Sequence, residues 1–370
     1  MREPIPGEMR ALTGLRGVLV AGVVLVHLDP TILQLLPGWS VFRHAVAHGP
    51  IVADCFFLLS GFTLFRASRT AGAPFSPARH GRFLWARFAR LWPNHVVTAA
   101  ALAGVVLAAR ARGIDLPGEF PLRDVPFQLT MTHAWWRSPG ADWNDISWYV
   151  SSQWFAYVLL LPLAGAALAR RWPPLVYAIV CAALPFVWLA IAWSSLPRAH
   201  FPIVRVTCAF LGGCALHGAS CDAPRVVAFL RRHATWFALV FVALVGTYVP
   251  YSFHALLLLA PLLVLGLTEE RSAAARLLAT APVVWLGRIS FAMYLSHVVA
   301  WRALQALAPA TRFAGAPLAE RLAVLASYGI AIVACAVALD RFVEVPARAA
   351  LGRFGARWWP PPAGDGARPA

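Results

Sequence analysis

Long apolar runs separated by short polar segments dominate the pattern along the chain. The apolar runs are candidate helices at residues 11–28, 50–66, 92–109, 147–168, 173–193, 202–217, 234–250, 254–268, 283–304 and 320–339. Because about 20 apolar residues in a helix cross a bilayer, the pattern predicts an all-α, polytopic membrane protein with about ten transmembrane helices. Only a few residues around Pro250 separate the seventh run from the eighth, so a single re-entrant pair is an alternative there.

The composition supports a membrane protein over a soluble one. Hydrophobic residues make up 60% of the 370 residues and charged residues 13%, whereas soluble domains average about 45–50% and about 25%. A water-soluble globule cannot bury so much apolar surface, and disorder requires low hydrophobicity. The first run is longer than the apolar core of a cleavable signal peptide, so we expect a retained first span.

Positive charge is distributed unevenly between the predicted loops. The chain has no lysine, and its 32 basic residues give a formal net charge of +16. Most arginines fall on one side of the bilayer if the N-terminus is inside, which predicts that both termini are cytoplasmic. Anionic lipid headgroups attract such arginines, so membrane lipid is an expected partner and nucleic acid is not. We expect a multi-pass protein of the cell inner (plasma) membrane.

The cysteines do not indicate a metal site. The six cysteines form no CxxC pair and lie mostly in apolar runs, and the spacing of zinc or iron–sulfur ligands is absent. We therefore expect buried apolar cysteines, no metal and no bound cofactor.

The first two spans carry ionisable side chains that a bilayer disfavours. Arg16 and His27 are eleven residues apart, close to three helical turns, so they share one face about 16 Å apart. Ionisable groups inside a span usually face the bundle interior, although these two positions also suit the two membrane interfaces. Asp54 lies near the outer end of the second span, where it would either orient an imidazole or cap the helix N-terminus.

Other runs carry polar residues with two possible roles. Arg87 and Arg90 are one helical turn apart, in the loop before the third span, a pairing that suits phosphate recognition or cytoplasmic anchoring. Ser60-Gly61 is typical of close helix packing. The fourth and ninth runs hold side chains that indicate helix–helix hydrogen bonds or a polar cavity, namely Trp148, Ser152, Gln153, Tyr157, Ser290, Tyr294 and His297.

These residues belong to short motifs that occur in a fixed order. The motifs are Leu12-x-Gly14-Leu15-Arg16 with His27, Phe56-Phe57-x-x-Ser60-Gly61-Phe62, Arg87-x-x-Arg90-x-x-Pro93, Trp148 through Tyr157, Leu286-Gly287-x-Ile289-Ser290-x-x-x-Tyr294-Leu295-x-His297, and Glu344-Val345-Pro346-Ala347-Arg348. In this order they resemble the acyltransferase 3 family of integral-membrane O-acyltransferases. The resemblance covers nearly the whole chain and suggests a transmembrane domain at 1–345, followed by a cytoplasmic Arg/Pro-rich tail at 346–370.

The resemblance implies which substrates the protein uses and which residues take part in the reaction. It implies ten core helices, acyl-CoA (acetyl-CoA is favoured) as the cytoplasmic donor, and a hydroxyl, usually on a sugar, as the acceptor. It also implies that His27 is the essential base and that Arg16 works with it. The family usually has Glu where this chain has Gln153, and often Tyr where it has Phe291. We expect no cation near Gln153, so a hydrogen-bonding role is favoured there.

The predicted function is O-acyl transfer at the inner membrane, from acyl-CoA to a hydroxyl of a cell-surface polysaccharide or its lipid-linked precursor. In this hypothesis His27 takes the hydroxyl proton during attack on the thioester. Asp54 orients His27, and Arg16, Arg87 and Arg90 hold the CoA phosphates. Direct transfer is preferred to an acyl-enzyme. The alternatives are acylation of a small secreted metabolite such as a macrolide, and a catalytically weakened glycan exporter or flippase, with the oligomeric state left open.

Overall fold

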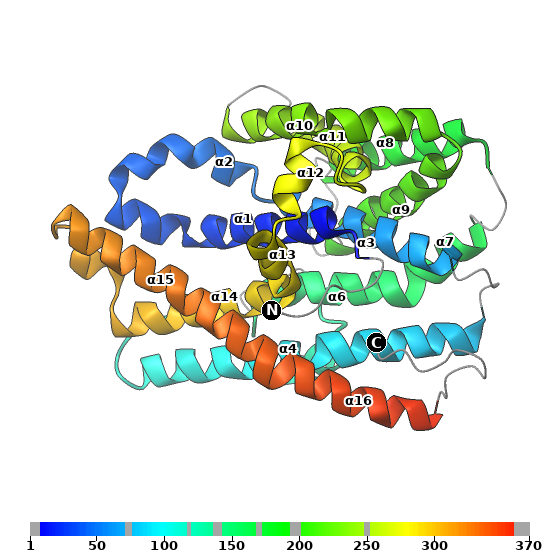
Figure 1. Cartoon of the computed structure of the whole chain (residues 1–370). Helices are drawn as coiled ribbons and strands as arrows, with labels where there is room; N and C mark the ends of the chain where they lie inside the picture. The colour runs from blue at the N-terminus through cyan, green and yellow to red at the C-terminus, as the bar shows by residue number, and fades with distance from the viewer. Residues whose placement is uncertain are drawn as a thin grey trace.

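The computed structural model describes residues 8–70, 76–116, 120–135, 143–167, 172–192, 201–247 and 252–358, and these residues form helices without strands (Figure 1). Within them, 8 helical segments are long and apolar enough to cross a membrane. The predicted all-α membrane fold is therefore confirmed. Six of these segments are the helices α1 (Arg10–Leu35), α3 (Ile51–Thr70), α4 (Pro77–Arg110), α8 (Pro174–Ala192), α9 (Phe201–Cys221) and α10 (Pro224–Gly246). The other two are the composite segments Asp145–Ala167 and Leu318–Trp358, the second of which begins with α15 (Leu318–Leu339). A further long helix, α14 (Ser290–Leu307), belongs to a bent pair.

The ninth predicted span is not a single helix. It is divided at Ile289 into α13 (Ala281–Arg288) and α14, which are bent by 69° relative to each other. Counting this pair as one span raises the number to 9. The eighth run forms α11 (Ser252–Gly266), whose 15 residues make it shorter than a usual span. The predicted count of ten stays a prediction.

The third predicted span begins much earlier than the apolar run suggested. α4 has 34 residues, and its N-cap Ser76 accepts a hydrogen bond from the Arg79 backbone N–H at 3.2 Å. Pro77 occupies the first turn, where its missing N–H costs nothing. Arg87 and Arg90 therefore lie within this helix. The prediction from the sequence, which placed them in a loop before the third span, was wrong. Their side chains are held on a rigid element.

Two segments, Asp145–Ala167 and Leu318–Trp358, each contain a π-helical turn directly before a proline-bearing helix. Pro162 and Pro346 cannot donate to the carbonyl four residues earlier, and a wider turn precedes each one. The predicted domain boundary at residue 345 falls inside the second of these continuous segments, and residues 359–370 of the predicted tail lie outside the described residues. The elements concerned are η3 (Asp145–Ser147), α6 (Trp148–Phe155), η4 (Ala156–Leu160), α7 (Leu161–Ala167), η7 (Asp340–Glu344) and α16 (Val345–Trp358).

Glycines of two motifs allow helices to cross with their backbones in contact. A Cβ at Gly14 would lie 1.9 Å from the carbonyl oxygen of Leu278, at the end of α12 (Ala273–Leu278). A Cβ at Gly61 would lie 2.0 Å from the carbonyl oxygen of Phe210. The close packing predicted for Ser60-Gly61 is thus confirmed at the crossing of α3 and α9. These contacts set how the adjacent polar side chains of α1 and α3 face the interior.

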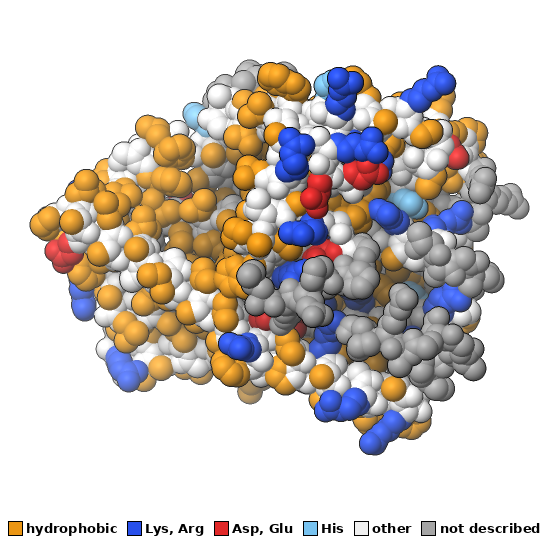
Figure 2. All heavy atoms as spheres, viewed as in Figure 1, with side chains coloured by type: hydrophobic (Ala, Val, Ile, Leu, Met, Phe, Trp, Pro, Cys, Tyr) orange, Lys and Arg blue, Asp and Glu red, His pale blue; other side chains and the backbone are white. Residues whose placement is uncertain are grey.

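The bundle has two ends that differ in charge. α1 and α4 run in the same direction, as do α14 and α1, so the starts of these helices gather toward one end (Figure 1). On the face shown in Figure 2, most arginine side chains lie over that end, and apolar side chains cover much of the other half. At the far end, Arg321 at the start of α15 donates to the Leu35 carbonyl at the end of α1, at 2.9 Å. We call these the arginine end and the opposite end.

Candidate active site

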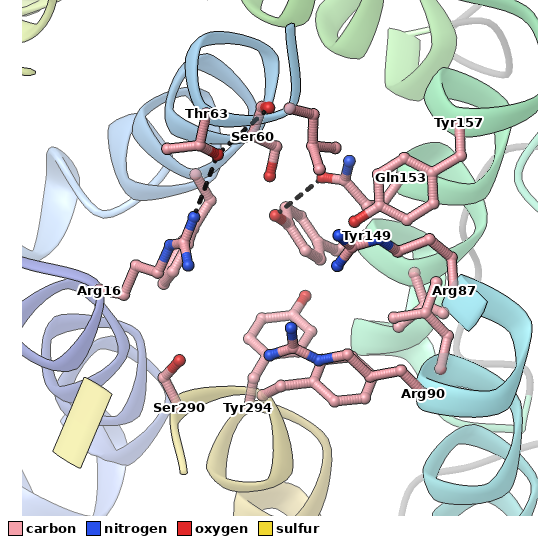
Figure 3. A pocket seen from close by; sticks show the side chains of 15 residues that line it. Arg16, Ser60, Thr63, Arg87, Arg90, Tyr149, Gln153, Tyr157, Ser290 and Tyr294 are labelled. Atoms are coloured by element: carbon pink, nitrogen blue, oxygen red, sulfur yellow. Dashed lines mark hydrogen bonds between the residues drawn. The ribbon is translucent and has the colours of Figure 1, made fainter. Parts of the chain in front are cut away.

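A cavity of about 100 Å³ collects side chains from α1, α3, α4, α14 and the α6–η4 segment. Figure 3 shows polar side chains of these elements pointing toward one another across it. Several residues singled out from the sequence line it, namely Arg16, Ser60, Arg87, Arg90, Gln153, Tyr157, Ser290 and Tyr294. Phe56 and Tyr149 also line it; they belong to the quoted motifs but were not predicted as site residues, and Thr63 was not identified from the sequence at all. We call this cavity the arginine pocket.

The arginine pocket carries an excess of positive charge. Among the described residues that line it are three arginines and no aspartate or glutamate. Arg16 donates a hydrogen bond to the Thr63 hydroxyl at 3.3 Å. The Arg87 guanidinium lies over the rings of Phe83 and Tyr157, at 5.2 and 5.8 Å from their centroids. Guanidiniums that converge on one cavity form a site for an anion such as phosphate.

Arg90 is positioned by a residue of the C-terminal motif. Its Nε lies 3.6 Å from the Glu344 carboxylate, which also accepts a hydrogen bond from the Asn94 side chain at 2.8 Å. Glu344 is buried, at 6% exposure, because the π turn of η7 directs it toward α4. The sequence showed the motif but not this role. Its signal was a glutamate directly after the last apolar run, close to Asp340 and Arg341.

Gln153 lies beside cations, contrary to the expectation from the sequence. The Tyr149 hydroxyl donates to Gln153 Oε1 at 3.1 Å, and Gln153 Nε2 is buried without a partner among the described residues. Arg16 and Arg87 line the same cavity as Gln153. Figure 3 shows the Arg87 side chain extending toward Tyr149 and Gln153. The prediction of no nearby cation was wrong because these arginines come from helices that are distant in sequence.

His27 and His297 lie together, with ring centroids 5.0 Å apart in an edge-to-face arrangement. The Nδ1 of His27 lies 2.8 Å from the Val23 carbonyl, and the Nδ1 of His297 lies 2.7 Å from the Tyr294 carbonyl. A carbonyl only accepts, so each Nδ1 carries a proton, and in the neutral form of each ring the lone pair is on Nε2. The Nε2 of His297 is buried without a partner among the described residues. Each imidazole is therefore fixed as a potential base.

An aromatic wall stands between the histidine pair and the arginine pocket. Tyr294 lines the pocket, and its ring centroid lies 6.0 Å from that of His297. Tyr149 packs on Tyr294 at 5.3 Å and on Phe56 at 5.9 Å. The Tyr294 hydroxyl donates to the Ile146 carbonyl at 2.6 Å, which holds the ring in place. The Tyr294 ring thus lies between the arginine pocket, which it lines, and the His297 ring.

Asp54 is paired with a cation and does not orient His27. Arg205 of α9 donates from Nε and Nη2 to the two carboxylate oxygens of Asp54, each at 2.7 Å. The Arg205 guanidinium also lies 5.7 Å from the Trp148 ring and 5.6 Å from the Trp188 ring. The close packing of α3 on α9 places this arginine opposite Asp54. The proposed Asp54–His27 contact is therefore corrected to a bidentate ion pair.

The other polar residues of the prediction are placed separately. Trp148 faces Arg205, and neither Trp148 nor the buried Ser152 is part of the wall of the arginine pocket. In the described part of the chain, no group of three or more His, Cys, Asp or Glu side chains could hold a metal ion.

Comparison with known proteins adds a family to this geometry. A family model described as an acyltransferase domain matches residues 9–341. Acyltransferase MdmB from Streptomyces mycarofaciens is 30% identical over 161 residues, which are 42% of this chain and 39% of that protein. Protein 2 in picA locus from Rhizobium radiobacter is 30% identical over 119 residues, 32% of this chain and 56% of that protein. The match thus spans only about half or less of either relative, and no solved structure matches the chain.

Proposed function

The chain belongs to the acyltransferase 3 family, and from this premise we propose that it moves an acyl group from acyl-CoA to an acceptor hydroxyl. One observation carries the proposal: a pocket of arginines and a pair of histidines lie on the two sides of a single aromatic wall. Such a wall separates a site suited to an anionic donor from a site suited to proton transfer.

The arginine pocket is proposed to bind the donor. CoA carries several phosphate groups, and guanidiniums bind phosphate through paired, charge-assisted hydrogen bonds. Arg87 and Arg90 lie in the first half of α4, toward the arginine end, whereas Arg16 lies across the pocket on α1. The CoA phosphates would occupy this side, and the pantetheine arm would carry the thioester toward Tyr294 and the histidine pair.

His27 is the proposed general base. Its Nε2 takes the proton of the acceptor hydroxyl as that oxygen attacks the thioester carbonyl. The new C–O bond forms, the C–S bond breaks, and the imidazolium returns the proton to the departing CoA sulfur. His297 contributes a second, buried ring in edge-to-face contact with His27, and this contact helps to fix the His27 ring.

We propose that the arginine end is cytoplasmic and that both termini lie on that side. The uneven distribution of arginines supports this orientation. Reporter fusions after Ser76 and after Trp143 would then report the inside and the outside of the plasma membrane. The same side for both would contradict the orientation together with the span between them.

The favoured acceptor is a cell-surface polysaccharide or its lipid-linked precursor, and O-acetylation is the favoured reaction. Small secreted metabolites and a glycan-export role remain the alternatives. Analysis of ester-linked acyl groups on the glycans of a deletion strain separates them. Loss of one ester with the glycan intact supports the proposal, whereas loss of the whole glycan supports export.

The chemistry itself is tested with purified protein in lipid nanodiscs and radiolabelled acetyl-CoA. His27→Ala should lose acyl transfer while it still binds CoA. His233→Ala is a matched control, because His233 also bonds its Nδ1 to a carbonyl one helical turn earlier, at 2.9 Å, but lies on α10. Transfer that survives in His27→Ala would exclude His27 as the base.

A further inference from the structure

A second and larger cavity lies at the opposite end of the bundle. Its volume is about 400 Å³. The end of α1, the segment after α4, the end of α14 and the 3₁₀ turn η6 (Ala310–Phe313) form its wall. The polar residues that contribute to the wall are Thr31, Gln34, Asp115, Arg302, Gln305, Thr311 and Arg312. We call it the Arg302 cavity.

Arg302 is the unusual member of this wall. It is only 8% exposed, and its Nε and Nη1 have no hydrogen-bond partner among the described residues. A guanidinium stays charged in proteins, and a buried charge without a partner is strongly destabilising. Asp145 acts on Arg302 electrostatically but is not part of the cavity wall. The cavity therefore presents an unused positive charge.

The remaining wall is rigid and adjoins the histidine pair. Thr31 is fully buried and accepts hydrogen bonds from Trp301 Nε1 at 2.9 Å and from Gln305 Nε2 at 2.8 Å. These bonds tie the end of α14 to the end of α1. Thr31 follows His27 by one turn, about 6 Å along the helix, and Arg302 follows His297 by about 7 Å. The wall of the cavity therefore begins about one helical turn beyond each histidine, on the same two helices.

The two charged residues on the rim do not cancel this charge. Asp115 and Arg312 are both exposed to solvent, and exposed charges interact weakly through water. The buried guanidinium dominates the interior of the cavity.

We propose that the Arg302 cavity is the acceptor subsite and that Arg302 binds an anionic group of the acceptor, a carboxylate or a phosphate. This inference rests on the proposed acyl transfer and narrows its acceptor to an acidic one. Arg302 holds the anion, and the hydroxyl to be acylated then faces His27. A neutral acceptor would leave the guanidinium unpaired. The same chemistry would let Arg302 hold the phosphate of an anionic lipid, so the test includes a lipid arm.

The test measures binding without turnover, using purified full-length protein in neutral detergent. The probes are glucuronate, glucose and inorganic phosphate at equal ionic strength, and the readout is the thermal unfolding temperature at increasing probe concentration. We expect glucuronate or phosphate to raise the unfolding temperature of the unchanged protein and glucose to have no effect. Arg302→Gln should weaken the anion effect about tenfold or more, since a charge-assisted hydrogen bond is lost. Arg353→Gln, at an exposed position of α16 outside the cavity, should preserve it.

A second measurement guards against a folding defect. Arg302→Gln removes an unpaired buried charge, so without any anion it should unfold at the same temperature or higher. Arg302→Lys keeps a charge and should retain part of the anion effect. No anion effect in the unchanged protein, or an equal effect in Arg302→Gln, overturns the proposal.

The lipid arm titrates phosphatidylglycerol in place of the soluble probes. Stabilisation by phosphatidylglycerol that depends on Arg302, without stabilisation by glucuronate or phosphate, would assign the cavity to a lipid headgroup and overturn the acceptor role. CoA binding, measured in the same way and tested with Arg87→Gln, reports on the donor site alone. Failure of the donor assay is therefore distinct from failure of the acceptor assay.

Discussion

The arginine pocket and the Arg302 cavity both present guanidiniums to an opening, but they hold them differently. In the arginine pocket, Arg16 has the Thr63 hydroxyl, Arg87 lies over two aromatic rings and Arg90 has Glu344, so each of the three cations is supported when the site is empty. In the Arg302 cavity, two guanidinium nitrogens have no partner among the described residues. Arginines that already have partners suit a ligand that binds and dissociates in every reaction cycle, such as the proposed acyl-CoA donor. A buried arginine without a partner favours an anionic ligand over a neutral one, because only the anion pairs with its charge.

Between the two sites lie the aromatic wall and the histidine pair, and the largest expected effect comes from there. His27→Ala should reduce acyl transfer by about 10²–10⁴-fold, because a positioned general base contributes that much. Binding at both ends should remain, since His27 lines neither cavity. Steady-state rates with acetyl-CoA and thermal shifts with CoA and glucuronate check this. Loss of binding at either end would make His27 a structural residue.

The next largest effect should separate binding of the acyl donor from binding of the acceptor. Arg87→Gln should raise the KM for acetyl-CoA about tenfold while kcat falls less, because contacts remote from the carbonyl give mainly uniform binding. Glu344→Gln should have a smaller effect of the same kind, because Arg90 would lose its positioning partner. Arg353→Gln, at an exposed position of α16, is the control. An unchanged KM in Arg87→Gln would leave this arginine as a membrane anchor.

Gln153 offers a smaller change within the arginine pocket. Gln153→Glu keeps an acceptor for Tyr149 but places a carboxylate among the arginines, so it should raise the KM for acetyl-CoA and leave activity lower or unchanged. Gln153→Leu leaves the Tyr149 hydroxyl without its acceptor, which costs about 1–3 kcal/mol of stability.

Adding Tyr149→Phe to Gln153→Leu should recover part of that stability, because both partners are then apolar. Unfolding temperatures and donor kinetics of the single and double variants are the measurements. A clear gain in rate for Gln153→Glu would show that the pocket works better with a negative charge at this position.

The smallest effect concerns an ion pair at the arginine end. Burial raises the pKa of Glu8, but the Arg288 guanidinium, 2.7 Å away, outweighs it and holds the pKa below its ordinary value of 4.5. The pair therefore stabilises the fold above about pH 4.5, and this contribution is lost as the pH falls through the lowered pKa. Glu8→Gln should lower stability by about 0.2–1 kcal/mol at pH 7, and the difference from the unchanged protein should vanish in acid. A pH-independent difference would assign the effect to packing.

Much of the candidate site could be predicted from the sequence. The spacing of Arg16 and His27 on one helix, and the polar stripe from Ser290 to His297, identified side chains that the fold does gather near one another. Local spacing succeeds here because an α-helix converts sequence distance directly into position on a face. The same reasoning failed for Asp54, whose partner Arg205 lies on another helix.

By itself, the sequence determined the class of protein, because apolar content and run length decide whether a chain can fold in water or must fold in a bilayer. It also determined the motif positions that mark the family. Only the tertiary structure decided which charges meet. Four features depend on where helices cross. They are the Asp54–Arg205 pair, the contact of Arg90 with Glu344, the arginines near Gln153 and the position of Arg302 in the wall of its cavity. The α3–α9 crossing behind the Asp54–Arg205 pair, for example, depends on a backbone contact at Gly61 with Phe210, a residue far away in the sequence, and no local pattern along the chain encodes it.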